Sequence, residues 1–241
     1  MPPPVVDPRA NLISSLRVDQ LEVSIQNNPL IFLCGGKVED DEAEPALSVR
    51  DKLLRHLVAT SNSLIHNISR AEEFKDWAED SVYKNLHDFE NHIGSMSSLI
   101  TIILESAGSL VELGMFAENA ILKSKLLVII DTDHFDQDSF IKHGPIKSIE
   151  LKDSNRVSVR QMGLKNPRKY DNNELQEITT DIEEEIKRLR TKVPFKKDDD
   201  GHIAFLIVAL VYLFKALKAD EIEAYLETLL QSEQLLSLIH I

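Results

Sequence analysis

The sequence is poor in cysteine, in glycine and in long apolar runs, and each shortage excludes a class of protein. Its single cysteine, Cys34, excludes a disulfide scaffold and any zinc or iron–sulfur site built from several thiolates. Eight glycines and nine prolines among 241 residues exclude collagen-like and low-complexity chains. The longest apolar run, from Ile203 to Phe214, is shorter than the roughly 20 residues of a membrane-spanning helix, so it fits a buried helix better.

Basic residues are also scarce, because 27 lysines and arginines face 40 aspartates and glutamates, for a formal net charge of −13. Proteins that bind nucleic acid over their whole surface neutralise phosphates with lysine and arginine, so this balance argues against that class. The first residues lack the cationic and apolar segments of a secretory signal. We therefore expect a cytoplasmic protein with no membrane contact.

The standard catalytic motifs are missing as well. The sequence contains no GxxxxGK[ST] phosphate loop and no HExxH, GxSxG or CxxC motif. Its histidines show no spacing that would direct two of them at one metal ion; His87 and His92, five residues apart, would diverge on a helix. We therefore expect neither a metal site nor a bound cofactor.

What is present is an alternation of short apolar segments with helical patterns. Residues 30–34, 99–104 and 125–130 are apolar without polar alternation, which is typical of strands buried in a parallel sheet. Residues 65–68 are a weaker candidate strand, and helical spacing marks residues 49–58, 86–95 and 113–122. We predict an α/β fold with a doubly wound, mostly parallel sheet. The carboxyl ends of its strands would bring four residues to one rim: Gly35, Gly36, Glu105 and Asp131.

The alternation stops after residue 131, and from residue 172 the chain shows helical patterns. We predict an N-terminal extension (1–28), an α/β domain (29–170) and an all-helical C-terminal region (171–241). The apolar ending, residues 236–241, follows no helix stop signal, so we expect this last region to be incomplete. Residues 147–169 carry seven basic residues against two acidic ones. We favour a solvated connecting segment there over a docking strip for an anionic partner.

Three glutamates are candidates for chemistry at the rim. Glu105 ends the strongest strand, Glu112 follows at the start of a helix, and Glu90 lies on the preceding helix. A carboxylate can attack the anomeric carbon of a sugar and form an ester, which divides one difficult step into two easier ones. Each glutamate also has a purely structural interpretation: Ser109 and Glu112 have the spacing of a capping box, Glu105 fits a turn, and Glu90 fits a helix surface. Spacing alone favours the capping box.

Four groups of residues, taken in order, carry a resemblance to a known family. They are Phe32–Gly36, Glu105–Ser109 with Glu112-Leu113-Gly114 and Phe116-Ala117, Lys125–Ile129, and Ser139–Ile141 with Gly144-Pro145. Over about residues 29–150 the chain resembles the effector (toxin) proteins of one group of bacterial retrons, which are similar to nucleoside 2-deoxyribosyltransferases. It departs from them before Glu72-Glu73, where relatives carry an aromatic residue.

The resemblance implies a nucleoside deoxyribosyltransferase-like domain followed by a winged-helix-like region. It implies cleavage of the N-glycosidic bond of NAD or a related nucleotide, with Glu112 as nucleophile and with Glu105 and Glu90 lining the same pocket. Backbone N–H groups of the substrate-binding residues Gly35, Gly36, Gly108 and Ser109 would then face the phosphates. The implied partners are a retron reverse transcriptase and its RNA-linked DNA, which restrain the effector until infection; whether the chain forms a homo-oligomer stays open.

The leaving group favours NAD as the substrate. Nicotinamide is attached through a cationic nitrogen and leaves as a neutral base, whereas a purine must be protonated as it leaves. A site with carboxylates and no placed histidine or lysine therefore suits the departure of nicotinamide. Three alternatives stay open: a non-catalytic nucleotide-binding sensor, a nucleoside 2-deoxyribosyltransferase, and a DNA-binding regulator. Acidic runs at residues 183–185 and 198–200 argue against the last.

Overall fold

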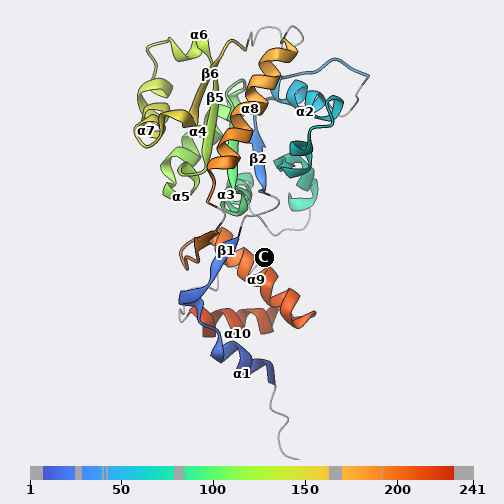
Figure 1. The fold of residues 1–241 in the computed structure, drawn as a ribbon, viewed down its shortest axis with the longest axis vertical. Coiled ribbons are helices and arrows are strands. Elements are labelled where there is room, and N and C mark those ends of the chain that lie inside the picture. Colours follow the sequence, from blue (N-terminus) through green and yellow to red (C-terminus); the bar gives the residue numbers. More distant parts are fainter. Residues whose placement is uncertain are drawn as a thin grey trace, which may run out of the picture.

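The computed structural model describes residues 8–24, 29–39, 41, 43–78, 83, 85–162, 170–190 and 192–230, and it arranges them in two bodies (Figure 1). The larger body is built around a β-sheet. In chain order its elements are β2 (Ile31–Cys34), α2 (Val49–Ala59), η2 (Ser63–Asn67), β3 (Ile68–Ser69), η3 (Ala71–Ala78), α3 (Leu86–Met96), β4 (Leu99–Ile103), α4 (Ala107–Glu118), α5 (Ala120–Lys123), β5 (Leu126–Asp131), α6 (Thr132–Phe135), η4 (Lys142–Ile146), α7 (Lys147–Glu150), η5 (Ser154–Arg156), β6 (Val157–Arg160) and α8 (Asn172–Arg188).

The sheet has five parallel strands in the order β3-β2-β4-β5-β6. Ile31 pairs with Leu99 in register, and Ile100 pairs with Leu126. The chain order reverses between β2 and β4, and in doubly wound sheets ligands bind beyond the carboxyl ends of the strands at such a switch point. The predicted α/β fold with a mostly parallel sheet is confirmed.

Two strands differ from the sequence prediction. The candidate at residues 65–68 is wrong for most of its length, because residues 63–67 form the 3-10 turn η2 and the strand β3 occupies only Ile68–Ser69. The fifth strand, β6, lies inside the basic stretch and was not predicted. Arg160 of β6 pairs with Glu177 and Asp181 of α8, with N–O distances of 2.7 Å in both cases. The prediction of a solvated connecting segment is wrong for residues 157–160, which form this strand, and Lys165, Arg168 and Lys169 of the basic stretch lie outside the described residues.

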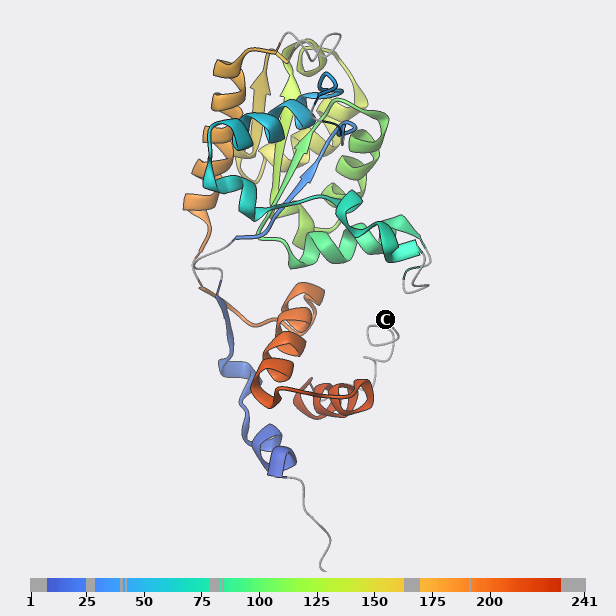
Figure 2. The ribbon, with the colours of Figure 1, turned by 90° about the vertical axis from the view of Figure 1, so that its right-hand side faces the viewer.

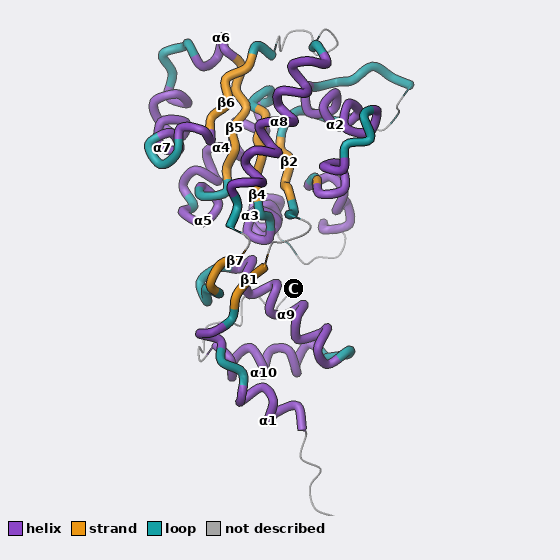
Figure 3. The backbone as a smooth tube through the Cα atoms, in the orientation of Figure 1, coloured by secondary structure: helices purple, strands orange, loops and turns teal. Residues whose placement is uncertain are grey.

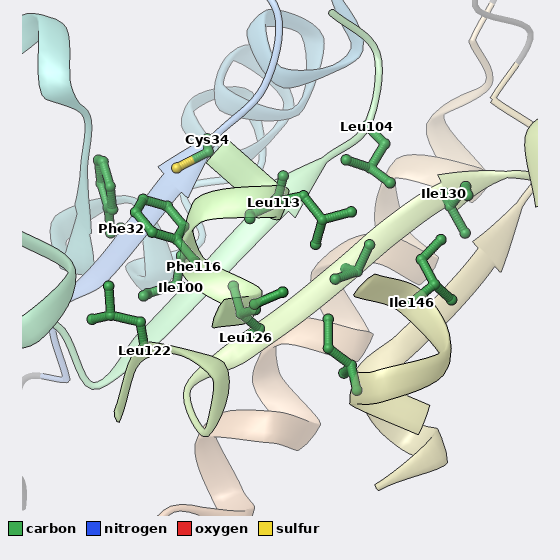
Figure 4. Close-up of a cluster of buried hydrophobic side chains, with 14 of the residues drawn as sticks. Phe32, Cys34, Ile100, Leu104, Leu113, Phe116, Leu122, Leu126, Ile130 and Ile146 are labelled. Carbon is green, nitrogen blue, oxygen red and sulfur yellow. The ribbon is translucent and has the colours of Figure 1, made fainter. Parts of the chain in front are cut away.

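Helices cover both faces of the sheet (Figure 3). On one face α3, α4, α5 and α7 pack against alternate strand residues, among them Phe32 and Ile100, which meet Phe116 of α4 (Figure 4). On the other face α2 and α8 pack against the intervening residues, such as Ile31. Successive side chains of a strand point to opposite faces, and here both faces are buried, which explains the unbroken apolar runs. Because α8 shares this core, the core extends past the boundary that the sequence places near residue 170.

The smaller body is formed by both end regions of the described chain. It contains α1 (Pro8–Ser15), η1 (Val18–Gln20), β1 (Glu22–Ser24), β7 (Lys192–Pro194), α9 (Asp200–Phe214) and α10 (Ala219–Leu230). Strands β1 and β7 pair antiparallel, and α1 lies beside α10 (Figure 2). Ile13 of α1 shares a core with Leu206 of α9 and Leu226 of α10. The N-terminal extension therefore packs on the C-terminal helices. The C-terminal region, predicted to be all-helical, also contains the strand β7. Residues 231–241, with the apolar ending, lie outside the described residues.

The two bodies meet where α9 begins. A Cβ atom on Gly201 would lie 2.0 Å from the backbone oxygen of Ser95, in the last turn of α3. The Lys125 ammonium donates a hydrogen bond of 2.5 Å to the same oxygen. Only glycine allows this approach, so the residue at position 201 fixes how closely α9 lies against α3.

Within the described residues, no single helix has both the length and the apolarity needed to cross a bilayer. Helices α9 and α10 reach that length and apolarity only when they are taken together, and a bend of 117° separates the two helices.

Candidate active site

A cavity of about 370 Å³ opens beyond the carboxyl ends of the strands, at the switch point between β2 and β4. Its walls come from β2 and the loop that follows it and from α2, η3, α3 and α4. The described polar side chains that line it are three carboxylates, two cations and a thiol: Glu72, Glu90, Glu112, Lys37, Arg50 and Cys34. The cavity therefore combines the chemistry of several groups that are distant in sequence.

Glu112 reaches this cavity from the second turn of α4. The helix begins at Ala107, and its N-cap is Ser106, which forms a reciprocal capping box with Ser109. The predicted capping box between Ser109 and Glu112 is therefore wrong, because the helix begins earlier than that spacing requires. The carboxylate of Glu112 is free of a capping role, and its buried Oε2 accepts no hydrogen bond from the described part of the chain.

The two carboxylates of α3 and α4 hold protons differently. Burial raises the pKa of Glu112 to about 6, an effect that the charge of Arg50 opposes and the charge of Glu72 strengthens. Glu90 is 6% exposed, and burial, followed by the charges of Glu112 and Glu72, raises its pKa to about 7. Near neutral pH Glu112 is thus mostly ionised, while Glu90 is protonated about half of the time.

Arg50 holds one wall of the cavity in place. Its buried guanidinium donates hydrogen bonds to the carbonyl oxygens of Gly36 (2.6 Å) and Leu33 (3.2 Å) and to Glu72 Oε1 (2.5 Å). It therefore ties the end of β2 to η3 from the first turn of α2. Sequence reasoning missed Arg50, because a buried cation beside the apolar positions of an amphipathic helix has no periodic signal.

Glu105 stabilises the backbone around the site and does not line the cavity. Its carboxylate accepts hydrogen bonds from the backbone N–H groups of Gly36 (2.9 Å), Val49 (2.6 Å) and Arg50 (2.9 Å). A carboxylate at the N-terminus of α2 is stabilised by the free N–H groups and by the helix dipole. Glu105 is not among the residues that line the cavity, so the structure brings Glu90 and Glu112 together there and leaves Glu105 behind the wall.

The four predicted substrate-binding residues also divide into two pairs. Gly35 and Gly108 line the cavity. The N–H of Gly36 already donates to Glu105, and a Cβ atom on Gly36 would lie 2.5 Å from the Cβ atom of Ser48. Ser109 is fully buried within the cap of α4. Of the four, Gly35 and Gly108 are thus the two that lie beside the cavity.

Metal ligands do not gather anywhere in the described part of the chain, where no three histidine, cysteine, aspartate or glutamate side chains are placed to hold an ion. Burial raises the pKa of the Cys34 thiol well above its usual value, and the charge of Glu112 adds to the effect. Cys34 therefore stays neutral, and it is the carboxylates that supply negative charge to the cavity.

Comparisons with known proteins give a consistent assignment. A family model described as "STM3845 retron effector protein" matches residues 46–241. The chain is 32% identical over 145 residues to the "Retron Ec73 putative ribosyltransferase/DNA-binding protein" of Escherichia coli, a match of 58% of this chain and 45% of the relative. It is 28% identical over 160 residues to the "Retron Ec86 putative ribosyltransferase/DNA-binding protein" of the same organism, a match of 66% of this chain and 47% of the relative. The matched region thus spans about half the length of these curated relatives.

Proposed function

Since the chain belongs to the STM3845 retron effector family, we propose that it acts as an antiphage retron effector that cleaves the N-glycosidic bond of NAD or a related nucleotide. One observation carries the chemical part of this proposal: Glu112 lines the cavity at the switch point of the sheet, and no hydrogen bond from the described residues reaches its buried Oε2. The names of both relatives, putative ribosyltransferases, agree with chemistry at a pentose.

In the proposed first step, a carboxylate oxygen of Glu112 attacks C1′ of the ribose. The C1′–N bond breaks, its electron pair leaves with the nicotinamide nitrogen, and an ester forms between Glu112 and the sugar. Nicotinamide leaves as a neutral base, so this step requires no proton. In the second step, water attacks C1′ while the C1′–O bond to Glu112 breaks and its electron pair returns to the carboxylate. Ionised Glu90 accepts the proton that the water loses and then releases it to solvent. ADP-ribose is released, and Glu112 returns to its ionised form.

The other members of the site support these two groups. Glu105 acts as a positioning residue, because it holds the loop after β2 and the start of α2 on which Arg50 stands. The charge of Arg50 keeps the pKa of Glu112 from rising further and so favours the ionised nucleophile. Gly35 and Gly108 line the cavity, and in this proposal their backbone N–H groups bind the ligand.

Glu90 also favours a second candidate function, transfer of deoxyribose between free bases. A purine leaves only when it is protonated, and the absence of a placed acid was the argument against this substrate. A carboxyl group with a pKa of about 7 in the same cavity supplies that acid. Transfer of deoxyribose between bases by the purified protein would establish this function.

The partners form part of the same proposal. Family membership supports association with a retron reverse transcriptase and its RNA-linked DNA, which would restrain the effector until infection. Both relatives are named as DNA-binding as well as ribosyltransferase proteins. We propose that the smaller body acts as a winged-helix-like module and makes the contact with this complex.

The test is the replacement Glu112→Gln, which keeps the size of the side chain and removes its charge. We expect nicotinamide release from NAD, and toxicity on expression without the restraining partners, to fall by at least about 1,000-fold, as for loss of other nucleophiles. Glu118→Gln, an exposed position of the same helix, is the matched control. Full activity of Glu112→Gln in a folded protein would overturn the mechanism. An absence of base release by the unrestrained wild type would overturn the proposed activity and favour the sensor alternative.

A further inference from the structure

The interior of the cavity is unsuited to phosphate. Glu72, Glu90 and Glu112 line it, and each is a carboxylate that repels a phosphate when ionised. Its volume of about 370 Å³ lies near the lower end of the roughly 300–1,000 Å³ that small-molecule sites span. A nucleotide that places its pentose against Glu112 therefore has to keep its phosphates outside, at the mouth of the cavity.

Among the described residues, two cations line this cavity, and one of them has its charge available. The guanidinium of Arg50 is buried and already donates to Glu72, Gly36 and Leu33. Lys37 is exposed, and it forms neither an ion pair nor a hydrogen bond with the described part of the chain. It follows Gly35-Gly36 after the carboxyl end of β2, and it is both exposed and part of the cavity lining, so it lies between the cavity and solvent.

From this arrangement, and resting on the proposed function, we propose that Lys37 binds a phosphate group of the nucleotide at the mouth of the cavity and makes the site selective for nucleotides over the corresponding nucleosides. The ammonium group is a point charge that pairs with phosphate oxygens without a fixed geometry. Because it lies outside the reacting centre, it contributes to binding and leaves the chemistry at C1′ unchanged. Lys37 would thus separate a nucleotide glycosidase from a nucleoside-directed enzyme of the same fold.

The test compares two substrates that share the reacting bond. NAD and nicotinamide riboside have the same C1′–N bond and the same leaving group, and only NAD carries phosphate. We expect Lys37→Ala to lower kcat/KM for NAD by about 10- to 100-fold, the effect of losing one charge-assisted contact, and to leave kcat/KM for the riboside unchanged. Lys37→Glu should lower kcat/KM for NAD further, and Lys37→Arg should retain most of the wild-type value. Lys187→Ala removes an exposed lysine of α8 and is the matched control.

Equal losses on both substrates, or no loss on NAD, would overturn the assignment of Lys37. Binding of ADP-ribose, measured by calorimetry, separates this outcome from failure of the proposed function. If the wild type binds ADP-ribose, Lys37→Ala weakens that binding about tenfold or more, and no base is released from NAD, then the phosphate site stands and the glycosidase activity fails. If base is released and Lys37→Ala leaves both measurements unchanged, the activity stands and the phosphate site fails.

Discussion

Glu90 on α3 and Glu112 on α4 line one cavity from two helices, and the pKa of Glu90 is the higher, about 7 against about 6. Burial is the main cause for both, and the charge of Glu112 adds to it for Glu90. As the pH falls, Glu90 is therefore protonated first, and Glu112 keeps its charge longer. This order agrees with the proposal that Glu112 of α4 is the nucleophile and that Glu90 of α3 exchanges protons.

The pH dependence of base release tests this order. With NAD as substrate, we expect the rate to rise in two steps, near pH 6 as Glu112 ionises and near pH 7 as Glu90 ionises. Glu90→Gln should remove the upper step, keep the lower one and reduce kcat by about 100-fold or more, because a general base is lost. Nicotinamide release between pH 5 and 9 measures both features. A profile of unchanged shape in Glu90→Gln would contradict the roles given to the two carboxylates.

The same carboxyl group couples protonation to stability. Because the pKa of Glu90 rises from 4.5 to about 7 on folding, the folded protein binds the proton more tightly, and the free energy of unfolding falls as the pH rises through this interval. We expect Glu90→Gln to be about 1–2 kcal/mol more stable than the wild type at pH 8, after an allowance for solvent screening. The difference should vanish below about pH 4.5. Urea unfolding at several pH values measures it, and a difference independent of pH would contradict the coupling.

Glu105→Gln should weaken the framework of the site. Three backbone N–H groups now share two carboxylate oxygens, and glutamine offers one acceptor oxygen without charge. We expect the free energy of unfolding to fall by about 1–3 kcal/mol, as for other charge-assisted bonds at a helix N-terminus. Thermal or urea unfolding gives the value, and Glu184→Gln, at an exposed position of α8, serves for comparison. Equal stability of the two variants would show that the Glu105 bonds contribute little.

Two glycines make a matched pair for testing the junction between the bodies. Gly201→Ala would place a Cβ atom 2.0 Å from the oxygen of Ser95, so α9 has to shift, and we expect a loss of about 1–3 kcal/mol. Gly114→Ala meets nothing within 4 Å in α4 and should gain up to about 1 kcal/mol from helix propensity. Calorimetric unfolding of the two variants gives both signs. Opposite shifts support the junction, whereas a gain in both variants would contradict the tight approach of α9 to α3.

Central strands were predictable from the sequence, and edge strands were not. Strands β2, β4 and β5 are buried on both faces, so they leave unbroken apolar runs that need no tertiary information. At the edges, β3 has two residues, and β6 ends in Arg160, which pairs with Asp181 of a helix later in the chain. An edge strand is thus identified by the residues that it contacts, and its own sequence does not show them.

The candidate site shows a similar division. The sequence named Glu90 and Glu112, which line the cavity, but the start of α4 depended on which of two serines caps the helix. The structure selects Ser106, whose Oγ also donates to the carbonyl oxygen of Gly35 across the switch point. Such a contact between distant segments leaves no local signal. The same holds for Arg50, whose role depends on carbonyl groups of another element.

The pairing of β1 with β7 has a consequence for biosynthesis. Chains emerge from the ribosome N-terminus first, at about 5–20 residues per second, and domains tend to fold as units. Ile13 leaves the ribosome long before Leu206 and Leu226, the residues that bury it, have been translated. Helix α1 therefore remains without the residues that bury Ile13 while the whole sheet is synthesised and folds. The smaller body therefore assembles after the sheet, and β1 pairs with β7 only after translation has passed β7.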